Sequence, residues 1–415
     1  MTVLRAITLV FIFASALAAQ DTISLTLPQA DSLLISRNLA LIASRYEIDM
    51  AAAARVQAKL FTNPELSTEW NLYNPSGPRW LDVGSSGQKI IALEKVFQLA
   101  GQRRTSIRLA DEVKRMTEYE YEVLARSLRY ELHVTFSRYY YLNNAVSNID
   151  SQLRLLKDLI HVYTEQYQKG NISLQELTRL NTTYFNINKQ VKDVQQEQIR
   201  LQETLKILLS EERYVIPEAL SLSLYTASDL KLEELVAYAL AGRPEVRIAL
   251  SQQQQNRLRY ELARKEAMPD LTAGILFDQS GSYVNNYTAF TLGMRLPVFN
   301  RNQGQIEIAR LGIEQGEKLQ RSAEQRIRSE VESAWQSFNL LLNQYNEVVG
   351  DHEEQLNLLS EGLVTNYSKG NISLLEFTDL FEAYNTNIIQ YSQLKADLIQ
   401  SYEELNHAVG RDISN

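Results

Sequence analysis

The sequence predicts a mainly α-helical protein built from two copies of a long helical hairpin, each copy carrying two β-strands. Three observations lead to this prediction: a long stretch without helix breakers, a motif that recurs 200 residues later, and short segments of alternating apolar residues. The 68 residues between Gly101 and Gly170 contain neither glycine nor proline. Such a stretch can form one helix on the order of 100 Å long, far longer than the helices of globular domains.

Apolar residues in the second half of this stretch follow a heptad spacing of alternating three and four residues. The seam consists of Leu142, Val146, Ile149, Leu153, Leu156, Ile160, Tyr163 and Tyr167. A heptad seam of this kind packs against a partner helix. The partner is predicted from Ser173 to Leu209, because Gly170 can end the first helix in the left-handed conformation and Ser173 forms a capping box with Glu176. The two helices are therefore expected to form a tight hairpin.

The same hairpin motif returns near the C-terminus. The ten residues from Tyr367 to Glu376 match those from Tyr167 to Glu176 at eight positions, including the glycine and both capping-box residues. A tandem duplication is the simplest explanation. The predicted parts are a first repeat over residues 19–209 with its hairpin end at 169–173, a linker over 210–228, and a second repeat over 229–415 with its hairpin end at 369–373.

Four segments have the alternating apolar pattern of β-strands. They cover about residues 64–73, 89–96, 271–278 and 287–296. Alternation over this length is what a tilted strand needs to cross a bilayer. Aromatic residues, which membrane interfaces favour, lie near the strand ends: Trp70, Tyr73, Trp80, Tyr283 and Tyr287.

Two interpretations of these strands remain open at this point. They are either soluble hairpins on a coiled-coil protein or membrane-spanning strands. Open sheet edges are not tolerated in lipid, and four strands cannot close a barrel. The membrane interpretation therefore predicts an oligomer.

Composition and the N-terminus narrow the function classes. The chain has 415 residues, no cysteine and a formal net charge of −8. Disulfides, thiol nucleophiles, Cys-ligated zinc and a Cys-linked lipid anchor are thereby excluded, and nucleic acid is an unfavourable partner. Residues 1–18 have the charge, apolar core and small residues of a signal peptide cleaved after Ala18. Export from the cytoplasm is therefore predicted.

No catalytic constellation competes with a binding or transport role. The four histidines are dispersed along predicted helices and are expected to be surface or packing residues: His133, His161, His352 and His407. Neither an enzymatic activity nor a metal site or cofactor is predicted.

The duplicated plan, the signal peptide and the lack of an internal apolar span resemble the TolC-type outer membrane factors of bacterial efflux systems. The hairpin ends are similar to that family's Tyr-x-x-Gly-x-x-Ser pattern, and the run from Leu296 to Gly304 resembles its CzcC-like heavy-metal branch. The resemblance implies a homotrimer with a 12-stranded barrel in the bacterial outer membrane and an α-helical tunnel across the periplasm.

Such a trimer would be the exit duct of a tripartite, RND-type efflux system. Its expected partners are outer membrane lipid, a periplasmic adaptor (membrane fusion protein) and an inner-membrane efflux pump. The substrate is not predicted, because the pump usually selects it. The alternative is a secreted or periplasmic coiled-coil adaptor or structural protein.

The resemblance also implies roles for the hairpin ends. Glu376 and Asp379 align with two acidic residues that line the family's periplasmic aperture, although Glu376 could equally be only a capping partner. The first repeat keeps Glu176 but has Arg179 at the second position, so it could supply a cationic partner. Adaptor docking is expected at Lys169, Gly170, Asn171, Ser173, Lys369, Gly370, Asn371 and Ser373.

Overall fold

The structure is a computed structural model that describes residues 21–75, 77–82, 84, 87–225, 231–281 and 284–413. The side chains of residues 223–224, 349–361 and 364 are outside this description. The predicted signal peptide, Tyr283 and the side chain of His352 therefore lie outside the described residues.

The first half of the chain contains six strands, four α-helices and a short 3₁₀-helix in its described part. They are β1 (Thr22–Leu25), α1 (Leu27–Arg37), α2 (Leu39–Lys59), β2 (Glu65–Trp70), β3 (Tyr73–Asn74), β4 (Arg79–Trp80), β5 (Lys89–Phe97), α3 (Gln102–Gln168), α4 (Leu174–Leu209), β6 (Tyr214–Pro217) and the 3₁₀-helix Leu222–Tyr225.

The second half repeats the order of two short helices, two strands and two long helices. It contains α5 (Leu232–Gly242), α6 (Pro244–Glu266), β7 (Leu271–Ser280), β8 (Asn285–Met294), α7 (Gln303–Ser368) and α8 (Leu374–Val409). The long helix predicted from the absence of breakers is thus present as α3, and its counterpart in the second half is α7. With 67 and 66 residues, α3 and α7 are each on the order of 100 Å long.

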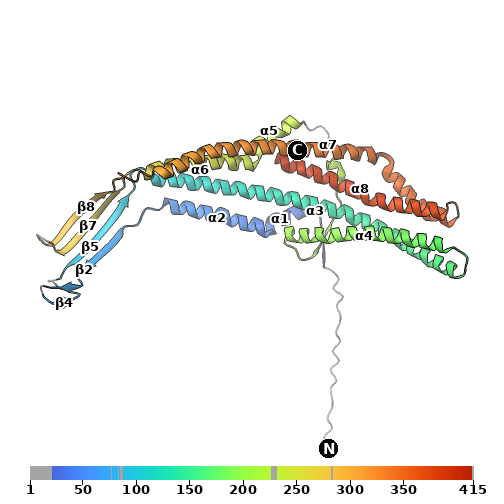
Figure 1. Cartoon of the computed structure of the whole chain (residues 1–415), viewed down its shortest axis with the longest axis horizontal. Coiled ribbons are helices and arrows are strands. Elements are labelled where there is room, and N and C mark those ends of the chain that lie inside the picture. The colour runs from blue at the N-terminus through green and yellow to red at the C-terminus, as the bar shows by residue number, and fades with distance from the viewer. Residues whose placement is uncertain are drawn as a thin grey trace, which may run out of the picture.

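The molecule is elongated, with its sheet at one end and the two hairpin ends at the other (Figure 1). Near the sheet, the helices lie side by side in the order α2, α3, α6, α7. Toward the hairpin ends the order is α4, α3, α8, α7. One margin of this layer is therefore formed by α2 and α4, and the other by α7.

Each long hairpin turns at a glycine in the left-handed conformation, with φ of +76° at Gly170 and +73° at Gly370. The next helix then begins with a capping box, in which Ser173 or Ser373 bonds reciprocally with the glutamate three residues later. These two devices satisfy backbone groups that a helix end leaves unpaired. The hairpins predicted at these positions are confirmed.

The heptad seam of α3 is buried as far as Leu156. Beyond it, Ile160 and Tyr163 are half-buried, and Tyr167 is 39% exposed. The seam packs against α4 and α8 together, since all three helices contribute to one buried apolar cluster. Fewer elements cover the last turns of the hairpin, so the aromatic part of the seam is only partly shielded.

The four longer strands form one antiparallel sheet in the order β2, β5, β7, β8. The central pair, β5 with β7, joins the two halves of the chain, with Leu93 opposite Ile275 and Phe97 opposite Leu271. β2 and β8 are the outer strands, each paired on one side only. The sheet thus has two open edges within this chain.

Two features of the connecting segments were not predicted. β1 and β6 form a parallel pair, so the segment expected to be a linker contains a strand that pairs with Thr22–Leu25, just before α1. Tyr73 and Trp80 face each other in the small β3–β4 hairpin between β2 and β5, with ring centroids 5.3 Å apart. Strands of two to four residues are too short for alternation to reveal them.

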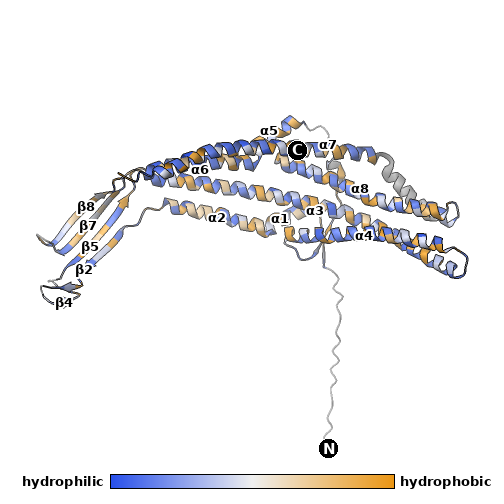
Figure 2. Ribbon diagram, in the orientation of Figure 1, coloured by the Kyte–Doolittle hydropathy of each residue, from blue (hydrophilic) through white to orange (hydrophobic). Residues whose placement is uncertain are grey.

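Among the described residues, no helix combines the length and the apolar character that membrane spanning requires. Hydrophilic residues occur along every long helix (Figure 2).

Candidate functional site: the hairpin ends and the sheet

The eight residues expected to dock an adaptor all lie at the ends of the two hairpins, and all are exposed. A Cβ atom placed on Gly170 or Gly370 would have no neighbour within 4 Å. The hairpin ends therefore have room for a partner, and only the positive φ angles restrict which residues fit.

The glutamates of both capping boxes are held by their serines. Oε2 of Glu376 accepts hydrogen bonds from the Ser373 backbone N–H (2.8 Å) and hydroxyl (2.8 Å). Glu176 is bonded to Ser173 in the same way, at 2.8 and 2.9 Å. The hydrogen bond from the serine backbone N–H, followed by that from the hydroxyl, lowers the pKa of each glutamate below its ordinary value. Both side chains thus remain charged while they cap a helix.

Arg179 and Asp379 meet across the two hairpins. Nη2 of Arg179 lies 3.3 Å from Oδ1 of Asp379, and its Nε donates to the Thr378 hydroxyl at 3.0 Å. A groove between α4 and α8 is lined by both charged residues and by Thr182 and Glu382. Arg179 therefore does face the acidic residue of the other repeat. Glu176 and Glu376 instead bond to their own helix starts.

An aromatic column that sequence reasoning missed joins the hairpins just before their ends. The hydroxyl groups of Tyr163 and Tyr367 are in direct contact. The Tyr367 ring stacks on Phe377 at 4.6 Å between centroids, and Phe377 continues to Phe381 at 5.4 Å. Burial, together with the Tyr163 contact, raises the pKa of Tyr367. The column links α3, α7 and α8. The only sign of it in the sequence is that its aromatic residues occupy apolar positions of the helical pattern.

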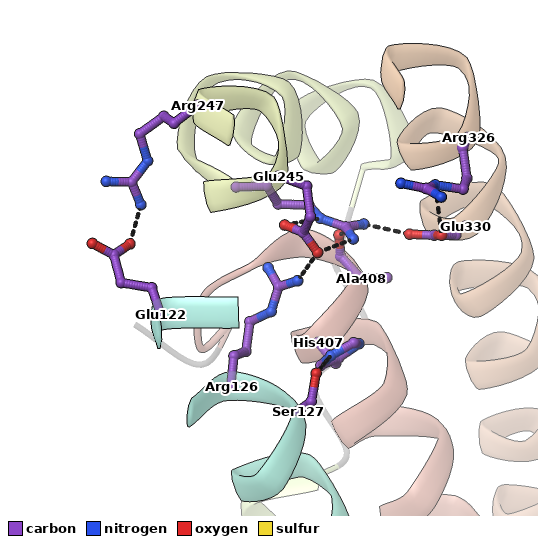
Figure 3. Close-up of polar contacts among 10 residues, drawn as sticks. Glu122, Arg126, Ser127, Glu245, Arg247, Arg326, Glu330, His407 and Ala408 are labelled. Atoms are coloured by element: carbon purple, nitrogen blue, oxygen red, sulfur yellow. Dashed lines mark hydrogen bonds and ion pairs between the residues drawn. The ribbon is translucent and has the colours of Figure 1, made fainter. Parts of the chain in front are cut away.

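A buried ion-pair junction holds α3, α6, α7 and α8 together midway along the molecule (Figure 3). Arg243 is 4% exposed and donates to Glu245 (2.7 Å), to Glu330 (2.6 Å) and to the Ala408 carbonyl (3.0 Å). Arg126 approaches Glu245 from α3. Burial disfavours the charged form of Glu245, but the hydrogen bonds from Arg243 and the charge of Arg126 outweigh it and lower the pKa to about 2.

Two of the four histidines lie in polar clusters between helices. His133 lies between α1 and α8, with Nε2 3.1 Å from both Asp31 oxygens and Nδ1 3.0 Å from Glu403 Oε1. His407 lies near the Ser127 hydroxyl at 3.4 Å, and burial with the nearby arginines lowers its pKa to about 4. His161 is exposed beside Glu165. Among the described residues, no group of histidines and carboxylates is suited to hold a metal ion.

The two faces of the sheet differ in chemistry. Residues paired across strands share a face, and one such row runs from Leu66 through Leu93 and Ile275 to Phe290. All four of these side chains are exposed, up to 72% for Phe290. The opposite face carries four carboxylates: Glu65, Glu69, Glu94 and Asp278. One face of the sheet is therefore apolar and open, and the other is acidic.

The second half of the chain matches a known family model. Residues 235–411, from α5 to the end of α8, match the model of the outer membrane efflux protein family. This segment is therefore similar to the outer membrane efflux proteins. No curated protein sequence matches the chain.

Solved structures of outer membrane channels share the fold over almost the whole chain. The Campylobacter jejuni CmeC outer membrane channel is 17% identical, with a TM-score of 0.73, covering 93% of this chain and 86% of that one. CusC, described with transmembrane channel formation, is 16% identical with a TM-score of 0.72 and coverage of 93% and 92%. The open-state MtrE channel of Neisseria gonorrhoeae is 17% identical with a TM-score of 0.68 and coverage of 93% and 89%.

These likenesses show that the chain as a whole, and not only residues 235–411, has the fold of these channels.

Proposed function

We propose that the chain is the outer membrane exit duct of a tripartite efflux system. One observation carries the proposal: a sheet with an exposed apolar face stands at the far end of helical hairpins that are on the order of 100 Å long. The sheet lies in the outer membrane and the helices extend into the periplasm. This arrangement can conduct a substrate through the periplasm and across the outer membrane, and such conduction needs no enzyme pocket.

The open edges of the sheet support an assembly of several copies. β2 and β8 each pair on one side only, and lipid does not satisfy free backbone groups. Pairing of β2 with β8 of the next copy satisfies both edges and closes the sheet. A head-to-tail arrangement of this kind forms a ring. We assign a homotrimer, in agreement with the family resemblance.

The margins of the helical layer have the apolar surface that such a ring requires. Exposed apolar side chains lie on α2, which forms one margin, and on α7, which forms the other. They are Tyr46, Met50 and Val56 on α2, and Ile308, Leu311 and Leu319 on α7, each at least 49% exposed. Contact between α2 of one copy and α7 of the next would cover both sets.

The hairpin ends form the periplasmic mouth of this duct. In a ring, Asp379 and Glu376 contribute carboxylates at the mouth, where Arg179 neutralises Asp379. Fixed carboxylates at a narrow opening favour cations. The exposed residues around Gly170 and Gly370 are the docking surface for helices of a periplasmic adaptor, which connects the duct to an inner-membrane pump.

The substrate assignment rests on sequence resemblance. The run from Leu296 to Gly304, which follows β8, resembles the heavy-metal branch of these exit ducts. We therefore propose metal cations as the first substrate class to examine. The carboxylates on one face of the sheet suit a cationic cargo.

Cell fractionation of the full chain tests the proposal. A heat-modifiable oligomer in the outer membrane fraction, and restored metal or drug resistance in a host that lacks its own exit duct, are the expected results. A soluble monomer in the periplasm or medium would refute the exit duct and favour a coiled-coil adaptor.

A further inference from the structure

A cluster of aromatic rings and cations stands where the sheet meets the helices. Phe61 follows α2, Lys95 and Phe97 end β5, and Arg103 lies in the first turn of α3. The Arg103 guanidinium lies 3.9 Å from the centroid of the Phe61 ring. The Lys95 ammonium lies 5.6 Å from the centroids of both Phe61 and Phe97. Cations at these distances are held over aromatic faces.

The cluster belongs to the apolar face of the sheet. Lys95 and Phe97 alternate on β5 with Glu94 and Val96, so they share a face with Leu93. Phe61 joins that face through its contact with Lys95. Phe61 is 68% exposed and Phe97 43% exposed. Both rings are therefore accessible in the part of the chain that the structure describes.

The two cations of the cluster, Lys95 and Arg103, have no carboxylate partner among the described residues. Arg103 donates one hydrogen bond from Nη1 to the Lys59 carbonyl at 2.6 Å, which fixes its orientation and leaves its other donors available. Glu94, the carboxylate next to Lys95 in sequence, points to the opposite face of the strand.

We propose that this cluster binds the phosphate groups of anionic phospholipids in the periplasmic leaflet of the outer membrane. The inference rests on the proposed function, which places the apolar face of the sheet against lipid. The helix side of the sheet is then the periplasmic side, so the cluster lies at the height of the lipid headgroups. Aromatic rings favour this depth, and a guanidinium and an ammonium are suited to phosphate.

The same strand provides a matched control. Lys89 lies on the same face of β5 as Lys95, at the opposite end, where it pairs with Trp70. Both lysines have an aromatic neighbour on the apolar face. Only Lys95 is at the end of the strand that leads into the helices. A general effect of positive charge would involve both lysines, whereas the proposed site involves Lys95 alone.

Lipid binding by the purified full-length oligomer in detergent tests the proposal, with fluorescent short-chain phosphatidylglycerol as the probe and phosphatidylcholine as the neutral comparison. Each of Lys95→Gln and Arg103→Gln is expected to weaken phosphatidylglycerol binding about fivefold, and the double variant about 25-fold, since one basic residue near an anionic lipid surface contributes about this much. Lys95→Arg keeps the positive charge and should therefore bind phosphatidylglycerol as tightly as the unchanged protein. Lys89→Gln and millimolar inorganic phosphate should leave binding unchanged.

Several results would overturn the inference. The first two are a double variant that binds phosphatidylglycerol as tightly as the unchanged protein, and a loss of affinity with Lys89→Gln as large as with Lys95→Gln. The other two are equal affinity for phosphatidylglycerol and phosphatidylcholine, and displacement of the lipid by inorganic phosphate at a similar concentration. Fractionation separates this failure from that of the proposed function. An oligomer in the outer membrane without a phosphatidylglycerol preference contradicts only the lipid site, whereas a soluble monomer contradicts both.

Discussion

Arg179 in the first hairpin and Asp379 in the second hairpin form an ion pair, with 3.3 Å between Nη2 and Oδ1. The two side chains are 43% and 66% exposed, so the pair contributes little to stability. Its effect is on the charge at the hairpin ends, because each copy then presents a neutral pair in place of a free carboxylate. The two repeats differ at this position, and that difference brings opposite charges together.

Neutralising Arg179 and neutralising Asp379 should shift the ion selectivity in opposite directions. Arg179→Gln leaves Asp379 unneutralised and is expected to raise the cation-to-anion permeability ratio about twofold, which corresponds to ~0.4 kcal/mol. Asp379→Asn should lower the ratio. Reversal potentials across planar bilayers in a KCl gradient measure both. Lys169→Gln, at an exposed position of the same hairpin end, is the control, and an equal shift in this variant would mean that Arg179 has no special role.

Two substitutions at Glu376 separate its capping role from its charge. Glutamine can keep the capping box but carries no charge, so Glu376→Gln should lower cation selectivity and leave thermal unfolding unchanged. Glu376→Ala loses the hydrogen bonds to Ser373 as well and should also unfold at lower temperature. Circular dichroism and reversal potentials on the same preparations distinguish the effects. Normal selectivity in Glu376→Gln would show that the carboxylate is only a cap.

Breaking the buried ion-pair junction around Arg243 should lower the free energy of unfolding substantially. Glu245→Gln leaves Arg126 and Arg243 without their shared carboxylate and should lower the free energy of unfolding by about 3 kcal/mol, as for other buried ion pairs that lose one partner. Glu330 pairs with the same Arg243 but is 41% exposed, so Glu330→Gln should cost clearly less. Denaturant unfolding of both variants measures the difference. Equal costs would contradict the central position given to Glu245.

The repeats, long helices and hairpins could be predicted from sequence because their determinants are local. The capping box at Ser373 and the left-handed glycine at Gly370 each involve only a few neighbouring residues. A long run without helix breakers is likewise visible in one continuous stretch of sequence. The order of strands in the sheet and the Tyr163–Tyr367 contact depend on how the two halves pack, and no local pattern encodes that. The gate and docking roles of the hairpin ends stay predictions, because they concern partner chains.

His133 should make stability depend on pH. Burial disfavours its charged form, but hydrogen bonds to Asp31 and Glu403 and their charges outweigh burial and raise the pKa to about 9. The folded pKa is above the ordinary value of 6.5, so this stabilisation is fully present below about pH 6.5 and is lost as pH rises through about 9.

The contribution of His133 amounts to up to about 3 kcal/mol. Thermal unfolding between pH 6 and pH 10 should therefore show a decline that His133→Asn removes. An identical pH profile in this variant would mean that the histidine is neutral in the folded protein.

Gly370 allows the backbone requirement of the hairpin end to be separated from its surface. Gly370→Val forces a β-branched residue to a φ of +73° and should lower stability by about 1–2 kcal/mol. Asparagine tolerates this conformation, so Gly370→Asn adds a side chain with little strain. Among the described residues, a Cβ atom at this position would have no neighbour within 4 Å, so both substitutions start from an open surface.

If the hairpin ends dock an adaptor, both Gly370 variants should therefore lose efflux while the oligomer stays in the outer membrane. Resistance assays and heat-modifiable mobility on a gel measure the two properties side by side. Normal efflux with Gly370→Asn but not with Gly370→Val would assign the glycine to backbone geometry alone and remove it from the docking surface.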